Sequence, residues 1–559
     1  MSVFIGYPSF MAYQMMKGKK GNNDGFPSIP GMIARYSAKG LTNEQMAENP
    51  VWKDLTGNGH DLQMKNLAWK GMSGVGGYVG DFSKWVNNRD TTEIGITKSN
   101  SKVIIDVKVS QGSGKNIVFI SKSNLGISNN VTIKITSTYP EGVMKFANSA
   151  SNKYLKLPSN GIITLQDNPE YTSNEMHLHL ASADLGQITI EQLPLYPGFI
   201  LGDGVDDFAV TEEDFNFEKE FCVYLAAIFF PQDSPHNDAV LGKDSNKDIR
   251  VLQYNNNLTF NSGNHTYCPV NLGQFSIVAF KRKDDTLIAK NLTTGVSNSV
   301  KATSGVLENP DKFYLWGIKG FSGYSDAAIA GSIIVNGHFT TDEDDEKVLD
   351  WHKKQYPWLF PDQAWTVTGK TNEDEDRATI ANITGNGNDL RLSNFGFAEG
   401  SGYNEEGEYA GYLVTDGVDD KIASSDFKIG KDFTIVGDWK FIIDENKGCG
   451  LVKVPKLYIY NSKTGLDIYI NSNSIKNVLS GIKGLNALCS DGRIYDCNWN
   501  EISVKYGNTV DINSSFLIAN SSNYITKMAF KNLGIYNNQL LSKDDCIKAY
   551  NYLQTLKAK

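Results

Sequence analysis

The chain has 559 residues, which is too long for a single hydrophobic core and predicts two to four domains. Its 54 Lys and Arg residues against 63 Asp and Glu residues give a net charge of −9, which argues against a nucleic-acid-binding protein. Abundant Gly, scarce Pro and frequent Ser, Asn and Gly turn clusters predict an all-β protein. No apolar run approaches the roughly 20 residues that a membrane-spanning helix needs.

The first 31 residues hold an apolar segment, FIGYPSFMAYQMM, which begins at Phe4 and is too short for a domain. Its Lys residues follow the apolar run, so we expect no secretory signal peptide. An isolated apolar segment cannot bury itself, and we expect residues 1–31 to anchor the chain to another protein subunit. The alternative is an extra edge strand on the domain that follows.

A first repeat begins with DLTGNGHDLQ at Asp54 and returns as NITGNGNDLR at Asn382, an offset of 328. In such a phrase Gly adopts positive φ, and Asp or Asn bonds its own main chain. The phrase therefore predicts a tight turn that a terminal Asp fastens, present twice because the fold is present twice. Its structural residues are Gly57, Gly59 and Asp61 with their partners Gly385, Gly387 and Asp389.

A second landmark, DGVDD, occurs from Asp203 and again from Asp416, where the offset has fallen to 213. The first copy therefore holds 115 extra residues between its two landmarks, which is the size of a small domain. Strand-like runs such as SKVIIDVKVS and GQITIEQLPL fill residues 92–195. We expect an inserted β-sandwich there, because surface loops with neighbouring ends tolerate insertions.

Each repeat ends in a segment that predicts a short helix. Thr341 and Ser542 are followed three residues later by an acid, which is the pattern of an N-terminal cap. In the second segment Cys546, Ala549, Tyr550 and Leu553 form one apolar stripe. None of the six cysteines forms a CxxC pair, and reduced, buried thiols are favoured over disulfides.

Taken in order, DLTGNGHDLQ, DGVDD, KDFTIVGDWKF, WNEISVKYG and the final helix resemble laminin-G/concanavalin-A-like jelly-roll domains. The stretch from IARYSAKGL to GMSGVGGY is similar to proteins of gut Bacteroidetes and their phages, including crAss-like phages, where such domains occur in virion fibres and appendages. The resemblance implies a twisted antiparallel sandwich without implying an activity.

The expected fold class is all-β, with two jelly-roll sandwiches of which the first is interrupted by a small inserted β-sandwich. The expected domains are an N-terminal anchor, a discontinuous first jelly roll, the inserted sandwich and a second jelly roll, spanning 1–31, 32–91 with 196–361, 92–195 and 362–559.

Catalysis by a carboxylate pair is the first chemistry to consider, since some glycosidases share this sandwich. The candidates are Glu212, Asp214 and Glu218, but Ser424, Asp426 and Gly430 hold the corresponding places in the second copy. A retaining glycosidase needs two carboxylates about 5 Å apart, and this spacing does not provide a clear pair. We therefore expect surface acids, no catalytic residue and no enzyme activity.

The two DGVDD turns offer hard oxygen ligands of the kind that calcium prefers. Turn-capping by Asp explains the same residues without a metal. Two alternatives therefore remain open: the protein binds no cofactor, or it binds calcium at these turns. The candidate ligands are Asp203, Asp206 and Asp207 with Asp416, Asp419 and Asp420. His177 and His179 share a strand face, but no third metal ligand is evident.

Sugar binding would use aromatic platforms, for which the first copy offers Trp52, Trp69, Tyr78 and Trp85, although core packing also explains them. The function that these observations and the resemblance favour is a virion fibre or appendage component, assembled in the host cytoplasm. Its expected partners are other virion proteins, copies of itself and host surface glycans. The alternative is a secreted or surface lectin-like adhesin of a gut bacterium.

Overall fold

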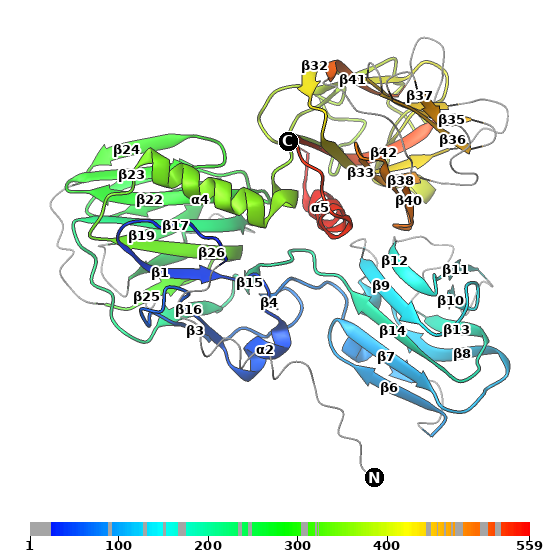
Figure 1. Ribbon diagram of the computed structural model, residues 1–559, viewed down its shortest axis with the longest axis horizontal. Helices are drawn as coiled ribbons and strands as arrows, with labels where there is room; N and C mark the ends of the chain where they lie inside the picture. The colour runs from blue at the N-terminus through cyan, green and yellow to red at the C-terminus, as the bar shows by residue number, and fades with distance from the viewer. Residues whose placement is uncertain are drawn as a thin grey trace. The chain divides into compact units, whose positions relative to one another are not determined.

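The computed structural model describes residues 24–87, 92–126, 131–148, 153–165, 175–232, 237–243, 249–302, 311–318, 321, 323–442, 449–454, 457–462, 465–470, 473–475, 484–503, 512–519 and 527–558. The chain divides into two compact units, one of Met1–Gly77 with Pro197–Gln355 and one of Tyr78–Tyr196 with Tyr356–Lys559. Figure 1 shows their strands and helices. Residues 24–31 of the expected anchor instead pack within the first unit, where Ile29 is buried and the Phe26 ring lies 5.0 Å from that of Trp351. The docking of the segment before Asp24 stays a prediction.

The first unit is a sandwich of two eight-stranded antiparallel sheets. One sheet has the order β24 (Ser297–Lys301), β23 (Thr286–Asn291), β22 (Phe275–Lys283), β17 (Glu220–Phe229), β26 (Asp326–Asn336), β15 (Ile200–Asp203) and β4 (Gly74–Val75), with β1 (Met32–Ser37) on β26. The other has the order β2 (Val51–Trp52), β3 (Leu62–Lys65), β16 (Phe208–Thr211), β25 (Phe313–Leu315), β18 (Asp238–Lys243), β19 (Arg250–Tyr254), β20 (Asn257–Asn261) and β21 (His265–Pro269).

The inserted segment in the second unit forms two five-stranded antiparallel sheets. The first runs β11 (Tyr154–Lys156), β10 (Met144–Asn148), β13 (Met176–Ser182), β8 (Ser113–Ile120) and β5 (Val86–Asn87). The second runs β12 (Asn160–Thr164), β9 (Thr132–Ser137), β14 (Gly186–Gln192), β7 (Lys102–Val107) and β6 (Ile94–Lys98).

The C-terminal segment of the second unit repeats the eight-plus-eight sandwich. One sheet runs β30 (Gly402–Asn404), β31 (Tyr412–Val414), β42 (Met528–Asn537), β33 (Phe433–Phe441), β38 (Gly484–Cys489), β39 (Arg493–Asp496) and β40 (Glu501–Ser503), with β27 (Gln363–Thr366) on β42. The other runs β28 (Thr379–Ile380), β29 (Leu390–Ser393), β32 (Lys421–Ile429), β41 (Ile512–Ala519), β34 (Cys449–Val454), β35 (Leu457–Ser462), β36 (Gly465–Ile470) and β37 (Asn473–Ile475). The fold class expected from the sequence is thereby confirmed.

Short helices accompany the sheets, and the two longest close the repeats. They are α2 (Asn43–Glu48), α3 (Lys122–Leu125), α4 (Asp342–Gln355), α5 (Lys543–Thr555) and the 3-10 turns η1 (Phe82–Lys84), η3 (Pro357–Leu359) and η4 (Gly407–Tyr409). The predicted caps are confirmed, because Thr341 Oγ1 accepts from Asp344 N at 3.2 Å and Ser542 Oγ accepts from Asp545 N at 3.1 Å. The predicted apolar stripe of α5 is buried along its length.

The insertion occupies a hairpin connection of the first jelly roll. Val75 of β4 pairs with Ile200 of β15, which brings the two ends of the insertion together. In the second jelly roll the equivalent strands β30 and β31 pair Tyr403 with Leu413, and residues 405–411 alone connect them. The offset difference seen in the sequence therefore corresponds to one enlarged hairpin loop.

Two expected domain boundaries need correction. The core of the inserted sandwich includes Phe82 and Trp85, and β5 pairs with β8, so this domain begins near Tyr78 instead of residue 92. The second jelly roll begins near Tyr356 instead of residue 362, because the Trp358 carbonyl accepts from Tyr536 Oη at 2.8 Å. Both corrections reflect aromatic packing that joins residues distant in the sequence.

Candidate functional site

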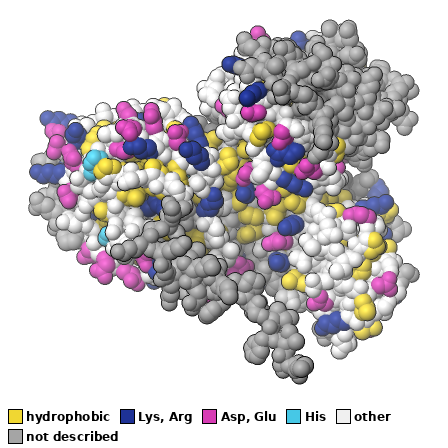
Figure 2. Space-filling model, in the orientation of Figure 1, with side chains coloured by type: hydrophobic (Ala, Val, Ile, Leu, Met, Phe, Trp, Pro, Cys, Tyr) yellow, Lys and Arg dark blue, Asp and Glu magenta, His cyan; other side chains and the backbone are white. Residues whose placement is uncertain are grey.

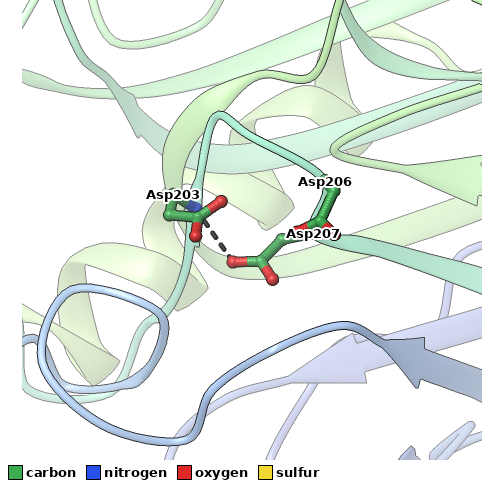
Figure 3. A group of neighbouring side chains, drawn as sticks. All are labelled: Asp203, Asp206 and Asp207. Atoms are coloured by element: carbon green, nitrogen blue, oxygen red, sulfur yellow. Dashed lines mark hydrogen bonds between the residues drawn. The ribbon is translucent and has the colours of Figure 1, made fainter.

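Each jelly roll ties its DGVDD turn to a glycine-rich loop, residues 66–74 in the first copy and 394–402 in the second, through one buried carboxylate. In the first copy Asp207 is 1% exposed, and its Oδ2 accepts from Asp203 N at 3.0 Å and from Ser73 Oγ at 2.8 Å. Figure 3 shows the bond to Asp203 N and the side chains of Asp203, Asp206 and Asp207 gathered at the turn. The turn is thus closed from within and fastened to the loop beside it.

The second copy reproduces this arrangement. Asp420 Oδ2 accepts from Asp416 N at 2.7 Å, and its Oδ1 accepts from Ser401 Oγ at 3.1 Å. At the tip of each turn a valine N–H donates to the first Asp, Val205 to Asp203 at 2.9 Å and Val418 to Asp416 at 2.7 Å. These valine side chains are 70% and 62% exposed, so the core does not account for them.

Serine and asparagine side chains of the glycine-rich loops also bond to the acidic turns, and we call each loop with its turn the rim of that jelly roll. The sequence patterns alone did not single out these serine and asparagine residues. Ser73 and Ser401 each accept a backbone N–H at 2.8 Å, from Ala68 and Gly396. Asn66 Nδ2 donates to the Asp206 carbonyl at 2.9 Å, as Asn394 does to Asp419 at 3.1 Å. The 328-residue offset that aligns the TGNG turns also aligns these residues and is the signal that could have found them.

Burial makes the side chains of Asp207 and Asp420 weaker acids than an ordinary aspartate. Desolvation is the main cause that raises the pKa of Asp207 to about 6, and the neighbouring negative charges of Asp203 and Asp206 add to it. Desolvation likewise raises the pKa of Asp420 to about 6. Burial therefore disfavours the charged form of one carboxylate in each turn near neutral pH. A bound cation would favour that charged form.

The geometry suits a metal ion better in the first turn than in the second. In both turns the three acids offer oxygens that lie within 4.8 Å of one another. Asp207 Oδ1 is buried and has no hydrogen-bond partner among the described residues, whereas both oxygens of Asp420 accept hydrogen bonds. Three carboxylates around one unsatisfied oxygen form a donor set for calcium. The other hydrogen bonds of these acids close the turn itself or fasten it to the glycine-rich loop.

An aromatic residue with positive φ lies in each glycine-rich loop. Trp69 has a φ of 54° and Phe397, its counterpart, a φ of 49°. A bulky side chain rarely adopts this conformation, which the buried core residues Trp316 and Trp499 share, each with a φ of 61°. Both rings are half-buried and pack on the core, and the Arg377 guanidinium lies over the Phe397 ring, 5.1 Å from its centroid.

The four residues expected to form an aromatic platform are divided between the two units. Trp52 and Trp69 belong to the first unit, whereas Tyr78 and Trp85 belong to the second. Trp52 is 1% exposed and donates to the Ser37 carbonyl at 2.9 Å, and Trp85 is fully buried against Phe82. These two rings are core residues, so neither can present an open face to a sugar, while Trp69 and Tyr78 remain half-buried.

The predicted TGNG turns are confirmed. Asp61 Oδ1 accepts from Asp54 N and Asp389 Oδ1 accepts from Asn382 N, both at 2.9 Å. The glycines at 57, 59, 385 and 387 all have positive φ. In the first copy Asp54 also accepts from Arg35 N and from Thr56, so its carboxylate is satisfied within the turn.

The other sequence candidates lie apart from this rim. Glu212, Asp214 and Glu218 are exposed in the connection between β16 and β17, where Lys312 Nζ lies 3.8 Å from Asp214. His177 and His179 point from the same face of β13, and His179 Nδ1 lies 2.9 Å from Asn116 Oδ1. Burial is the main cause that lowers the pKa of both imidazoles.

Acidic and basic side chains are interspersed over the described surface that faces the viewer in Figure 2.

Among the described residues no helix is long and apolar enough to cross a membrane.

No protein-family model matches the chain, and no curated protein matches it. Among solved structures it is similar to the botulinum neurotoxin serotype D binding domain, with 10% identity, a TM-score of 0.26 and coverage of 62% of this chain and 89% of that one. The binding domain of botulinum neurotoxin DC in complex with SialylT gives 10% identity, a TM-score of 0.27 and coverage of 60% and 92%. Domain 4 of a GH43 extracellular arabinanase from Geobacillus stearothermophilus, in complex with arabinotriose, gives 14% identity, a TM-score of 0.22 and coverage of 27% and 80%.

Proposed function

We propose that this protein is a non-catalytic recognition protein whose two jelly rolls bind carbohydrate at their rims, and that it serves in a virion fibre or appendage. The observation that carries the proposal is the duplicated rim. Each copy places a strained, part-exposed aromatic ring in the loop that Ser73 or Ser401 fastens to an acidic turn. Small-ligand sites commonly combine an aromatic surface with a few fixed polar groups.

The roles within the rim follow from the chemistry of the side chains. Trp69 would stack on the apolar face of a sugar ring, whereas Phe397, whose ring Arg377 covers, would offer its edge. The exposed Val205 and Val418 would extend that contact. The outer acids of the turns can accept hydrogen bonds from sugar hydroxyls. In the first turn Asp207, Asp203 and Asp206 would hold calcium, whose charge would offset the desolvation of Asp207.

A recognition role is favoured over hydrolysis by the placement of the candidate acids. Glu212, Asp214 and Glu218 lie in an exposed connection, and the equivalent positions of the second copy are not all acidic. Purified full-length protein should release no reducing sugar from gut polysaccharides. Release that the triple change Glu212→Gln, Asp214→Asn and Glu218→Gln abolishes would instead make the protein a hydrolase.

Binding can be tested with the full-length protein on an array of microbial and mucosal glycans, followed by calorimetry on each glycan that binds. Trp69→Ala and Phe397→Ala should each weaken binding about tenfold or more while leaving thermal unfolding nearly unchanged. Tyr254→Ala removes a ring that is 44% exposed elsewhere on the first unit and should not alter binding. Unchanged binding in the Trp69→Ala, Phe397→Ala double variant would place the sugar site elsewhere.

The virion assignment rests on the sequence resemblance and has its own test. Mass spectrometry of purified particles from an infected culture should detect this chain at a constant ratio to the major virion proteins. Truncation before Asp24 should leave both units folded but prevent incorporation. Recovery of the chain only from the bacterial surface would favour the lectin-like adhesin.

A further inference from the structure

A buried ion pair fastens helix α4 to its sheet in the first jelly roll. Lys281 Nζ of β22 lies 2.7 Å from Asp345 Oδ1 of α4, and each side chain is 4% exposed. The ammonium also donates to the Thr340 carbonyl at 3.1 Å, and Tyr224 Oη donates to Asp345 at 2.8 Å. Each buried charge therefore has a charged partner and an additional hydrogen bond, which fixes the helix over the sheet.

Two cysteines occupy these positions in the second jelly roll. Lys281 lies opposite Cys222 in the pairing of β22 with β17, and Cys489 lies opposite Thr434 in the pairing of β38 with β33. Asp345 is the fourth residue after the capping Thr341, as Cys546 is after Ser542. Cys489 and Cys546 thus replace an ion pair whose role is to hold a helix on a sheet.

The two thiols are buried together. Both are fully buried, and their side chains form a hydrogen bond with each other. Thr434 Oγ1 adds a donor 3.9 Å from Cys489 Sγ. The bond from Cys546, helped by the charge of Arg493, lowers the pKa of the Cys489 thiol, whereas the same bond raises the pKa of Cys546. Cys489 therefore ionises more readily than Cys546.

We propose that Cys489 and Cys546 form a disulfide that joins β38 to α5 when the protein meets a disulfide oxidant such as oxidised glutathione. When local opening at α5 exposes Cys489, its thiolate attacks one sulfur of the oxidant, whose S–S bond breaks and releases one thiolate. Cys546 then loses its proton and attacks Cys489 Sγ, which forms the new S–S bond and expels the second thiolate. Two electrons pass to the oxidant, and the two cysteine protons end on the two released thiols.

The disulfide would stabilise the second jelly roll at the position where the ion pair of Lys281 and Asp345 stabilises the first. It closes a loop that contains β39, β40, β41 and β42, so it restricts the unfolded chain strongly. We expect the melting transition of the second jelly roll to rise by about 5 °C or more on oxidation. The first jelly roll, which holds its helix by the ion pair, should not respond.

The test uses the full-length protein, incubated with oxidised or with reduced glutathione below its melting temperature. Free thiols are then alkylated, and peptides are identified by non-reducing mass spectrometry beside a melting curve. Oxidised protein should yield a linked peptide pair that contains Cys489 and Cys546. Cys546→Ser should lose both the linked pair and the melting shift, whereas Cys497→Ser, which changes a thiol in the same jelly roll, should keep both.

Three outcomes would overturn the proposal. These are glutathione adducts without a cross-link, a linked pair that involves a different cysteine, and a Cys489–Cys546 link that leaves the melting curve unchanged. If Cys546→Ser does not fold, the comparison of oxidised and reduced wild-type protein decides the question by itself.

Discussion

Ser73 Oγ donates to Asp207 Oδ2 over 2.8 Å, although 134 positions separate the two residues in the chain. The whole inserted sandwich lies between them. In the second jelly roll Ser401 makes the equivalent bond to Asp420 at 3.1 Å across a short connection. The bond is therefore a property of the rim, maintained whether the intervening hairpin loop is short or has become a domain.

Ser73→Ala should destabilise the first jelly roll by about 1–3 kcal/mol, because it withdraws a donor from a buried carboxylate. Urea unfolding measures the change. Ser297→Ala, on the exposed edge strand β24, is the matched control and should lie within about 0.5 kcal/mol of wild type. Equal effects of the two substitutions would show that the Ser73–Asp207 bond contributes nothing to stability.

Asp207→Asn should change how stability depends on pH in protein stripped of calcium. The folded pKa of Asp207, about 6, lies above its ordinary value of 3.8, so the folded state binds more protons between these two values. This carboxylate therefore lowers stability as pH rises from about 4 to about 6. Relative to wild type, the variant should gain stability over that interval, as chemical unfolding at pH 4.5 and pH 7 can measure.

Calcium should reverse this effect in wild-type protein, because it binds the deprotonated carboxylate. Added calcium should raise the melting temperature at pH 7.5, and the rise should disappear near pH 5. Asp207→Asn should lose the rise, while Asp426→Asn, a change of an exposed acid outside the turns, should keep it. A calcium effect that survives Asp207→Asn would rule out the first acidic turn as its origin.

The enlarged hairpin can be replaced by its short counterpart. Substituting residues 404–412 for residues 76–199 should leave the first jelly roll folded, since Val75 and Ile200 already lie opposite each other, as Tyr403 and Leu413 do. Circular dichroism and a cooperative melting curve of the isolated first unit carrying this graft provide the check. A deletion limited to residues 92–195 should behave worse, because it leaves Phe82 and Trp85 without their core.

The buried ion pair of the first jelly roll should respond strongly to loss of one partner. Asp345→Ala strands Lys281 in the interior and should cost about 3–5 kcal/mol. Glu343→Ala removes one of the two acids that pair with Lys347 on the exposed face of the same helix and should cost far less. Chemical unfolding of both variants gives the comparison, and similar losses would mean that Asp345 does not hold the helix.

The sequence by itself determined the features that depend on neighbours along the chain. Strand alternation gave the all-β class, the TGNG phrase gave the two turns that Asp61 and Asp389 fasten, and the caps at Thr341 and Ser542 gave the closing helices. Repetition of these local patterns then revealed the duplication and the insertion. Each depends on backbone preference over a few residues, which a single sequence records directly.

Only the tertiary structure decided what depends on contacts between distant residues. It buried Trp52 and Trp85 while leaving Trp69 part-exposed, although all three are tryptophans in one region of the sequence. It joined Ser73 to Asp207, and it placed Cys489 against Cys546 where the other copy has Lys281 and Asp345. Burial and pairing arise from the way sheets stack, and residue type alone does not encode which side chains meet.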